Sequence, residues 1–108
     1  MGFGYLESVY EKCLMLELEE AGLNAAAQVP IPVAYRGRTV GNFVADLLVN
    51  DVVVVELKSV RTIERSHEAQ LVSYLVSTGK PVGLLINFGE TGVQVKRKVR
   101  QLTSNSIQ

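Results

Sequence analysis

The nine residues VVVVELKSV, at positions 52–60, constrain the fold more than any other stretch of this chain. Four valines in a row predict a strand that is buried on both faces. Since side chains alternate along a strand, Glu56 and Lys58 share one face of it. A buried charge costs several kcal/mol unless it is paired, or bound to a metal or ligand. The pattern therefore predicts either a functional site or an ion pair on an edge strand.

Composition narrows the class of protein. With 108 residues, 47% of them hydrophobic and 20% charged, the chain predicts one globular domain with a modest core. Its formal net charge is zero, so a nucleic-acid partner would have to bind at a local basic patch. The single Cys13 excludes an internal disulfide and fits a reducing cytoplasm. The apolar runs are too short for a membrane span, and the opening residues lack a signal-peptide pattern. We therefore expect a cytoplasmic protein that does not bind membranes.

The first half of the chain predicts one helix and three strands. Apolar residues at a spacing of three and four indicate an amphipathic helix over residues 5–21. The segment VPIPVAYRGRTVGNFVADLLVN predicts two strands joined by a tight turn at Arg36, Gly37 and Arg38. Pro30 and Pro32 are expected to keep the first of these strands short and at an edge. The valine strand follows Asn50.

The second half predicts a helix and two further strands. Residues 63–77 again show helical spacing, and Gly79 with Pro81 should end that helix. PVGLLINF is an apolar run of strand length, and GVQVKRKV alternates as an edge strand does. The expected order is helix, three strands, helix, two strands. We expect residues 1–102 to form one domain and residues 103–108 to be a flexible tail.

Two carboxylates and a lysine converge on neighbouring strands. Asp46 lies in the second predicted strand, and Glu56 and Lys58 lie in the third. Mg²⁺ favours a pair of carboxylates completed by waters and by phosphate oxygens of a substrate. Such a cation stabilises developing negative charge on a phosphate, while Lys58 can orient a water molecule or offset charge. The pattern therefore favours metal-dependent phosphate chemistry.

This interpretation depends on the register of one hairpin. A two-residue turn at Asn50 and Asp51 would set Asp46 opposite Val55, which places Asp46 and Glu56 on different faces. A three-residue loop over positions 50–52, or a bulge near Asp46, sets Asp46 beside Glu56 instead. Asn-Asp is also a weaker two-residue turn than Asn-Gly. We therefore predict a three-residue connection or a bulge, with the two carboxylates close enough to share one ion.

The chain resembles a known family from its first residues onward. GYLESVY supplies Gly4, Glu7 and Tyr10 at the spacing of the GxxExxY proteins, a family of the PD-(D/E)XK nuclease superfamily. The resemblance continues through PIPVAYRG, GNFVADLLV, VVELKSV, HEAQLVSYL and GLLINFG. It implies an α/β, restriction-endonuclease-like core, with a mixed sheet of four to five strands flanked by two helices. It also places the site on the central hairpin of that sheet.

The same resemblance implies roles for five residues. Asp46 and Glu56 match the metal-binding carboxylates, Lys58 matches the catalytic lysine, and Glu7 matches an acidic residue near the metal. Gln70 matches a polar residue on the helix after the third strand. For Glu7 the alternative is a solvated residue that interacts favourably with the helix dipole. For Gln70 the alternative is an amide hydrogen-bonded to the backbone.

One local concentration of positive charge is a candidate nucleic-acid surface. If the last strand is regular, Lys96, Lys98 and Arg100 share one face. Arg36 and Arg38, in the first hairpin turn, are candidates to extend that surface. Removal of one phosphate-contacting residue should lower the log–log salt slope of binding by about one. The alternative is a solvated edge that discourages strand-to-strand aggregation.

These observations predict a nuclease that uses Mg²⁺, or Mn²⁺, to hydrolyse phosphodiester bonds, with DNA favoured over RNA. The alternative is a catalytically idle member of the fold that binds nucleic acid or protein. His67, the single histidine, faces either the site or the solvent. The resemblance implies a further segment ahead of Gly4 that is absent here, so either the chain is a fragment or something else covers the apolar side of the first helix. We therefore expect the apolar surface of that helix to be buried in a homodimer.

Overall fold

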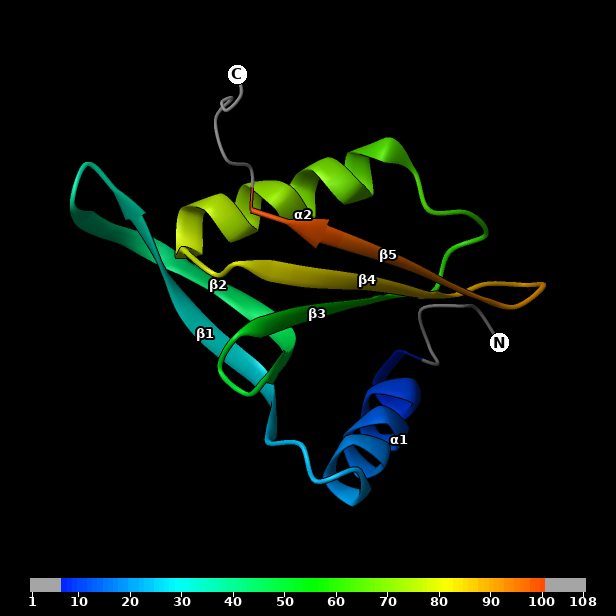
Figure 1. Cartoon of the computed structure of the whole chain (residues 1–108). Helices are drawn as coiled ribbons and strands as arrows, with labels where there is room; N and C mark the ends of the chain where they lie inside the picture. Colours follow the sequence, from blue (N-terminus) through cyan, green and yellow to red (C-terminus); the bar gives the residue numbers. More distant parts are fainter. Residues whose placement is uncertain (1–6, 101–108) are drawn as a thin grey trace.

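The computed structural model describes residues 7–100 (Figure 1). Within this range the elements follow in the predicted order: α1 (Glu7–Glu20), β1 (Ala25–Tyr35), β2 (Arg38–Val49), β3 (Val53–Lys58), α2 (Arg65–Thr78), β4 (Val82–Phe88) and β5 (Val93–Val99). The strands form one sheet in the order β1-β2-β3-β4-β5. Only the pair β3–β4 is parallel. The predicted mixed sheet flanked by two helices is therefore confirmed, with five strands. Neither described helix is long and apolar enough to cross a membrane.

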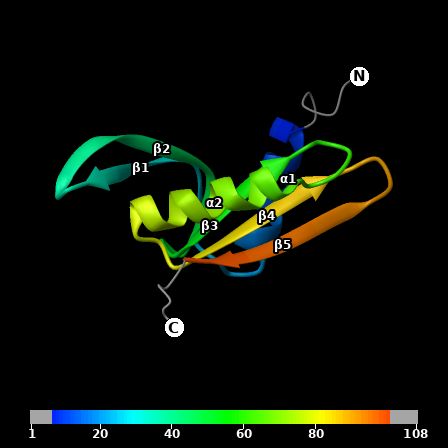
Figure 2. The same ribbon diagram turned by 90° about the horizontal axis from the view of Figure 1, so that it is seen from above.

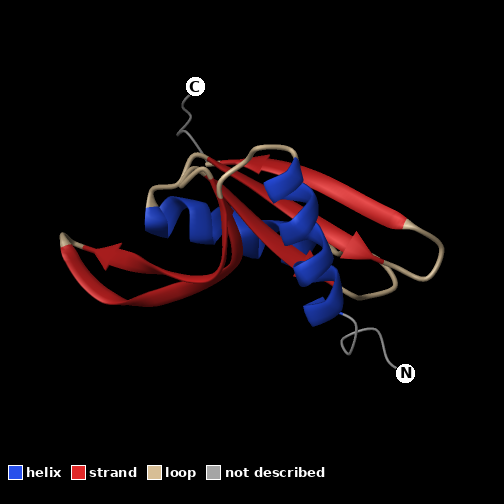
Figure 3. Cartoon of the chain, turned by 90° about the horizontal axis from the view of Figure 1, so that it is seen from below, coloured by secondary structure: helices blue, strands red, loops and turns tan. Residues whose placement is uncertain are grey.

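The two helices cover opposite faces of the sheet, as Figures 2 and 3 show from above and below. Helix α2 is the crossover that parallel strands β3 and β4 require. Its face of the sheet holds one apolar cluster: Ile31, Phe43, Ala45, Leu48, Val54, Ile63, Leu71, Leu75 and Leu85. The α1 face holds a second, built on Leu47, Val49, Val55 and Leu57. Strand β3 thus contributes Val54 to one cluster and Val55 to the other. The expected strand buried on both faces is confirmed.

Strand β1 is longer than the short strand that we expected from its two prolines. It spans 11 residues and lies at the edge of the sheet, where it pairs only with β2. Pro30 and Pro32 are two residues apart, so the N–H groups they lack would both point in the same direction, away from β2. The prolines therefore place β1 at the edge, as expected, without shortening it. Arg36 and Gly37 form the turn into β2 with φ angles of 52° and 76°.

Helix α1 packs lightly against the sheet. None of its residues is fully buried, although Leu14, Met15 and Leu18 pack against the second cluster. Tyr10 stacks on Phe88 with ring centroids 3.9 Å apart and planes within 6°. The burial of these side chains fixes the face that α1 turns toward the sheet.

A buried asparagine secures the segment that leaves β3. Asn87, on β4, is fully buried. Its Oδ1 accepts a hydrogen bond from the Val60 N–H at 2.9 Å, and its Nδ2 donates to the Val60 carbonyl at 2.8 Å. Nδ2 also donates to Gln94 Oε1 at 3.1 Å. Since a buried amide without partners is costly, these bonds hold the chain in place two residues after Lys58.

Candidate active site at the gap between two strands

Asp46 and Glu56 lie side by side where β2 and β3 separate. The regular pairing of these strands ends at Leu47 opposite Val55, so the next pair along is Asp46 and Glu56. At this point, hydrogen bonds from the backbone to their carboxylates replace the backbone–backbone hydrogen bonds of the sheet. The Asp46 N–H donates to Glu56 Oε2 at 3.1 Å, and the Leu57 N–H donates to Asp46 Oδ2 at 2.8 Å. Each carboxylate is thus held by the backbone of the opposite strand.

The register that brings the two carboxylates together is the predicted one. Val49 pairs with Val53, which leaves a three-residue connection over positions 50–52. Asn50 and Asp51 both have positive φ angles, 52° and 60°, which asparagine and aspartate tolerate better than most residues. The Asn50 side chain accepts a hydrogen bond from the Asn24 N–H at 3.0 Å. This contact supports the turn from the side of α1.

Strand β2 changes face at Asp46. Ala45 belongs to the apolar cluster beneath α2, whereas Leu47, two residues on, belongs to the cluster beneath α1. In a flat strand both would point the same way. Opposite this point, Gln28 of β1 has a φ of 53° and does not take part in the regular pairing. This local twist explains how the Asp46 side chain reaches across to the backbone of β3.

Burial and like charge act together on Glu56. Burial, and after it the charge of the nearby Asp46, raise the pKa of its carboxyl to about 7. The backbone N–H of Asp46 and the charge of Lys58 oppose this rise. A carboxylate with its pKa raised in this way is one that a bound cation would stabilise.

Glu7 belongs to the same electrostatic group. Its pKa is raised by burial and then by Asp46, while Lys58 and a backbone hydrogen bond from Ser59 lower it. Glu7, Ser8, Glu11, Gln28, Asp46 and Leu57 line a hollow of about 250 Å³ on the α1 side of the gap. Sequence reasoning missed Glu11 and Gln28, which are joined by a 2.8 Å hydrogen bond. Glu11 lies one helical turn after Glu7, and that spacing was the one available signal for it.

Lys58 lies on the α2 side of the sheet, whereas Glu7 lies on the α1 side. A small hollow on that side is lined by Glu56, Lys58, His67, Gln70, Leu71, Tyr74 and Leu85. His67 therefore faces the site, which the sequence left open between site and solvent. Its Nδ1 accepts a hydrogen bond from the Glu64 N–H at 3.0 Å, as part of the cap that begins α2. Gln70 is exposed and lies at the rim of the hollow.

The donor set of this site fits a hard divalent cation. Asp46 and Glu56 supply two neighbouring carboxylates, which is the number that Mg²⁺ commonly takes from protein. Among residues 7–100, no group of three acidic, histidine or cysteine side chains is close enough to hold one ion. The roles of Asp46, Glu56 and Glu7 as metal ligands therefore stay predictions, and the hydrogen bonds hold the first two beside each other. Ser59 carries a buried hydroxyl without a hydrogen-bond partner in the described part of the chain, as expected beside a site completed by a bound group.

The predicted basic residues do not form one surface. Lys96 and Lys98 share the α2 face of β5, because they pair with Leu85 and Gly83. Arg36 and Arg38 lie at the turn between β1 and β2. This hairpin is at the opposite edge of the sheet from β5 (Figure 1). The two arginines therefore do not extend the β5 surface, because three strands lie between β1 and β5, and their role in binding nucleic acid stays a prediction.

Lys98 of β5 and Arg100, which follows the strand, also bind other groups of the protein. Lys98 pairs with Glu68 at 2.8 Å, and Arg100 donates to the Gly79 carbonyl at 2.9 Å, at the end of α2. Arg36 lies over the ring of Tyr35 at 5.3 Å. Arg100 and Arg36 therefore take part in local structural contacts. Lys96 and Lys98 are the two basic residues that share the α2 face of β5.

A family model described as the PD-(D/E)XK nuclease superfamily matches residues 1–101. The chain belongs to the PD-(D/E)XK nuclease superfamily. Members of this superfamily generally use divalent metal ions, which agrees with the Asp46–Glu56 donor pair. Among curated proteins, none matches the chain.

Two solved structures share the fold. The crystal structure of SSO0001 is 19% identical with a TM-score of 0.64, and the match covers 94% of this chain and 54% of that one. An alkaline exonuclease (LHK-Exo) from Laribacter hongkongensis is 12% identical with a TM-score of 0.54, over 87% of this chain and 56% of that one. This chain therefore spans about half the length of each of these two solved proteins.

Proposed function

We propose that this protein is a Mg²⁺-dependent nuclease that hydrolyses phosphodiester bonds in nucleic acid, with DNA as the favoured substrate and Mn²⁺ as a possible substitute ion. The observation that carries the proposal is that each carboxylate accepts a backbone N–H across the gap between β2 and β3: Glu56 from Asp46, and Asp46 from Leu57. These bonds hold two like charges together next to a lysine, at an energetic cost that a bound cation would remove. Membership of the superfamily supports the same reaction class.

Each residue of the site has a distinct task in this proposal. Asp46 and Glu56 hold the ion, which when bound stabilises charge on the phosphate and lowers the pKa of a water molecule. Lys58 lies two residues from Glu56 on the same face of β3, where its ammonium group can orient the attacking water and offset charge. Gln70 lies at the rim on the α2 side, in position to hydrogen-bond a phosphate or water. Glu7 adds negative charge on the α1 side, which favours cation binding.

We further propose that the chain belongs to the GxxExxY family within the superfamily. Glu7 and Tyr10, two of its signature residues, have separate tasks on α1: Glu7 lines the site and Tyr10 anchors the helix on Phe88. Gly4 lies outside the described residues, as does the predicted tail over residues 103–108. The single domain over residues 1–102, the cytoplasmic location and the homodimer remain predictions.

Calorimetric titration with Mg²⁺ and with Mn²⁺ tests the metal site. We expect wild-type protein to bind one of these ions and Glu56→Ala to lose that binding, because one of two carboxylate ligands is removed. Glu20→Ala removes an exposed acid at the far end of α1 and should bind as wild type does. Absence of binding in the wild type would favour the alternative, a catalytically idle module that binds nucleic acid or protein.

Cleavage assays test the reaction itself. With labelled double-stranded DNA, single-stranded DNA and RNA, we expect metal-dependent cleavage by wild type. Lys58→Ala should lower the rate by about 10²- to 10⁴-fold while calorimetry still detects the ion. Metal binding without cleavage of any of the three substrates would contradict the nuclease proposal and leave the metal site intact.

A further inference from the structure

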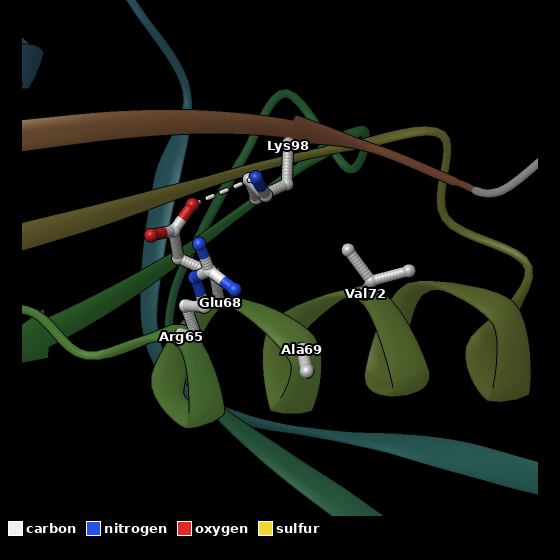
Figure 4. A pocket seen from close by; sticks show the side chains of 5 residues that line it. All are labelled: Arg65, Glu68, Ala69, Val72 and Lys98. Atoms are coloured by element: carbon white, nitrogen blue, oxygen red, sulfur yellow. Dashed lines mark hydrogen bonds and ion pairs between the residues drawn. The ribbon is translucent and has the colours of Figure 1, made fainter.

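A second hollow lies on the other flank of α2, between this helix and β5. Its volume is about 440 Å³, and it is lined by Arg65, Glu68, Ala69, Val72 and Lys98 (Figure 4). Lys98 points from β5 toward α2, where its Nζ lies 2.8 Å from Glu68 Oε1. The side chains of Lys98 and Glu68 remain 30% and 23% exposed. The ion pair is therefore accessible to a competing ligand.

This hollow carries more positive than negative charge. The hydrogen bond from Lys98 lowers the pKa of Glu68 and outweighs the opposing effect of burial. The charges of Lys98, Lys96 and Arg65 each lower the pKa by a smaller amount. Three cations thus surround one carboxylate. Arg65 is also the first residue of α2, so the positive end of the helix dipole lies here as well. The chain has a net charge of zero, yet this region is locally cationic.

The sheet connects this hollow with the candidate active site. Lys96 pairs with Leu85 on β4, and Leu85 pairs with Glu56 on β3. The three residues form one row across the α2 face of the sheet, since paired residues point the same way. With strands about 4.8 Å apart, Lys96 begins about 10 Å from Glu56. Leu85 is buried beneath α2, so a nucleic-acid strand that reaches both sites would pass around the helix, at about 3.4 Å per phosphate along a duplex.

We propose that this hollow is a second anion site, which binds a backbone phosphate of a nucleic-acid strand and in which the Glu68 carboxylate holds the place of that phosphate. A carboxylate and a phosphate offer an ammonium group the same kind of charged oxygen acceptor. The incoming phosphate displaces Glu68 from Lys98, and Arg65 and Lys96 add to its attraction. Ala69 and Val72 give the wall an apolar surface for a sugar. This proposal deepens the proposed nuclease function and rests on it for the identity of the ligand.

Binding of a fluorescent single-stranded DNA oligonucleotide, measured by anisotropy in EDTA, tests the site without turnover. We expect Glu68→Gln to bind about two- to tenfold more tightly than wild type, because Lys98 no longer has an internal partner. Glu20→Gln removes the same charge at the end of α1, on the opposite face of the sheet, and should change affinity less. Equal affinities for Glu68→Gln and Glu20→Gln would overturn the proposal.

A double variant separates the local ion pair from general electrostatics. If Glu68 acts by occupying Lys98, the gain from Glu68→Gln disappears when Lys98→Gln is also present. A gain that persists without Lys98 would contradict the mechanism. In addition, Lys98→Gln alone should lower the slope of log affinity against log salt by about one. An unchanged slope would show that Lys98 contacts no phosphate.

Cleavage measured in parallel distinguishes failure of this inference from failure of the nuclease proposal. Metal-dependent cleavage by wild type, with no response of oligonucleotide binding to Glu68→Gln or Lys98→Gln, would overturn the anion site alone. Binding that depends on Lys98, with no cleavage in Mg²⁺ or Mn²⁺, would support the anion site and contradict the nuclease reaction.

Discussion

At the scale of single residues, Glu56 has the most strongly perturbed environment in the described chain. Burial and the neighbouring Asp46 raise its pKa from the ordinary 4.5 to about 7. Asp46 and Glu56 each accept a backbone N–H from the opposite strand, so neither carboxylate can move away from the other without breaking a hydrogen bond. The two are held together by the fold, and a bound cation would remove the resulting repulsion.

This arrangement predicts a pH dependence of stability when no divalent ion is bound. The folded state holds the Glu56 proton up to about pH 7, whereas the unfolded state loses it near the ordinary pKa. Glu56 therefore contributes stability that is fully present below about pH 4.5 and is lost as the pH rises to about 7, by at most about 3 kcal/mol. Urea unfolding in EDTA from pH 4 to 8 should show this loss in wild type.

Glu56→Gln is the matched control, because the amide keeps the shape of the side chain and does not titrate. We expect its unfolding free energy to vary less with pH across the same window. Added Mg²⁺ at pH 8 should stabilise wild type and have little effect on Glu56→Gln. The same pH dependence in both proteins would show that Glu56 is not the group responsible.

At the scale of elements, α2 is positioned by its contact with β4. Gly83 of β4 lies directly beneath Leu71 of α2, which is only 2% exposed. A Cβ at Gly83 would lie 3.0 Å from Leu71 Cδ1 and 3.2 Å from Leu71 Cγ. The absence of a side chain at Gly83 thus sets how closely α2 approaches the sheet. That approach brings Gln70 and His67 to the rim of the site.

Gly83→Ala is therefore expected to destabilise the protein by about 1–3 kcal/mol, because Leu71 is buried and has little room to move. Gly41→Ala serves as the control: Gly41 lies in β2, and nothing stands within 4 Å of the Cβ that it would gain. We expect that change to be neutral or slightly stabilising. Urea midpoints for the two variants measure the difference, and equal midpoints would contradict the close packing of α2 on β4.

At the scale of the whole molecule, α1 shows apolar residues on its outer side as well as toward the sheet. Val9 is 50% and Leu16 is 60% exposed, and Cys13 between them is also exposed. Their spacing of four and three places all three on one stripe of the helix. The stripe gives the predicted homodimer a specific surface. With no net charge on the chain, two copies have little overall repulsion to overcome.

We expect light scattering at tens of micromolar to give twice the monomer mass for wild type, and the monomer mass for Leu16→Lys. The reason is that a lysine in the middle of the stripe would bury a charge in the interface. Val76→Lys is the matched control, since Val76 is 53% exposed on α2, on the other face of the sheet. A monomeric wild type, or a dimer that survives Leu16→Lys, would exclude this surface.

Local rules were enough to predict much of the architecture and the centre of the site from the sequence. Alternation along β3 placed Glu56 and Lys58 on one face, and the need to set Asp46 beside Glu56 predicted the three-residue connection. The expectation that Asn50-Asp51 fits a tight turn poorly was wrong, because both residues adopt positive φ angles. The first two inferences depend on side-chain period and turn geometry within about a dozen residues. The order of helices and strands followed from periodicity in the same way.

Only the tertiary structure decided which distant side chains meet. Lys98 and Glu68 are 30 residues apart, and no spacing rule connects a strand residue with a helix residue across a loop. The meeting of Gln28 with Glu11 depends likewise on how α1 lies against the edge of the sheet. Arg36 and Arg38 separate from Lys96 because sheet order places β1 and β5 at opposite edges. Period and turn geometry act along the chain, whereas these contacts depend on the packing of whole elements in three dimensions.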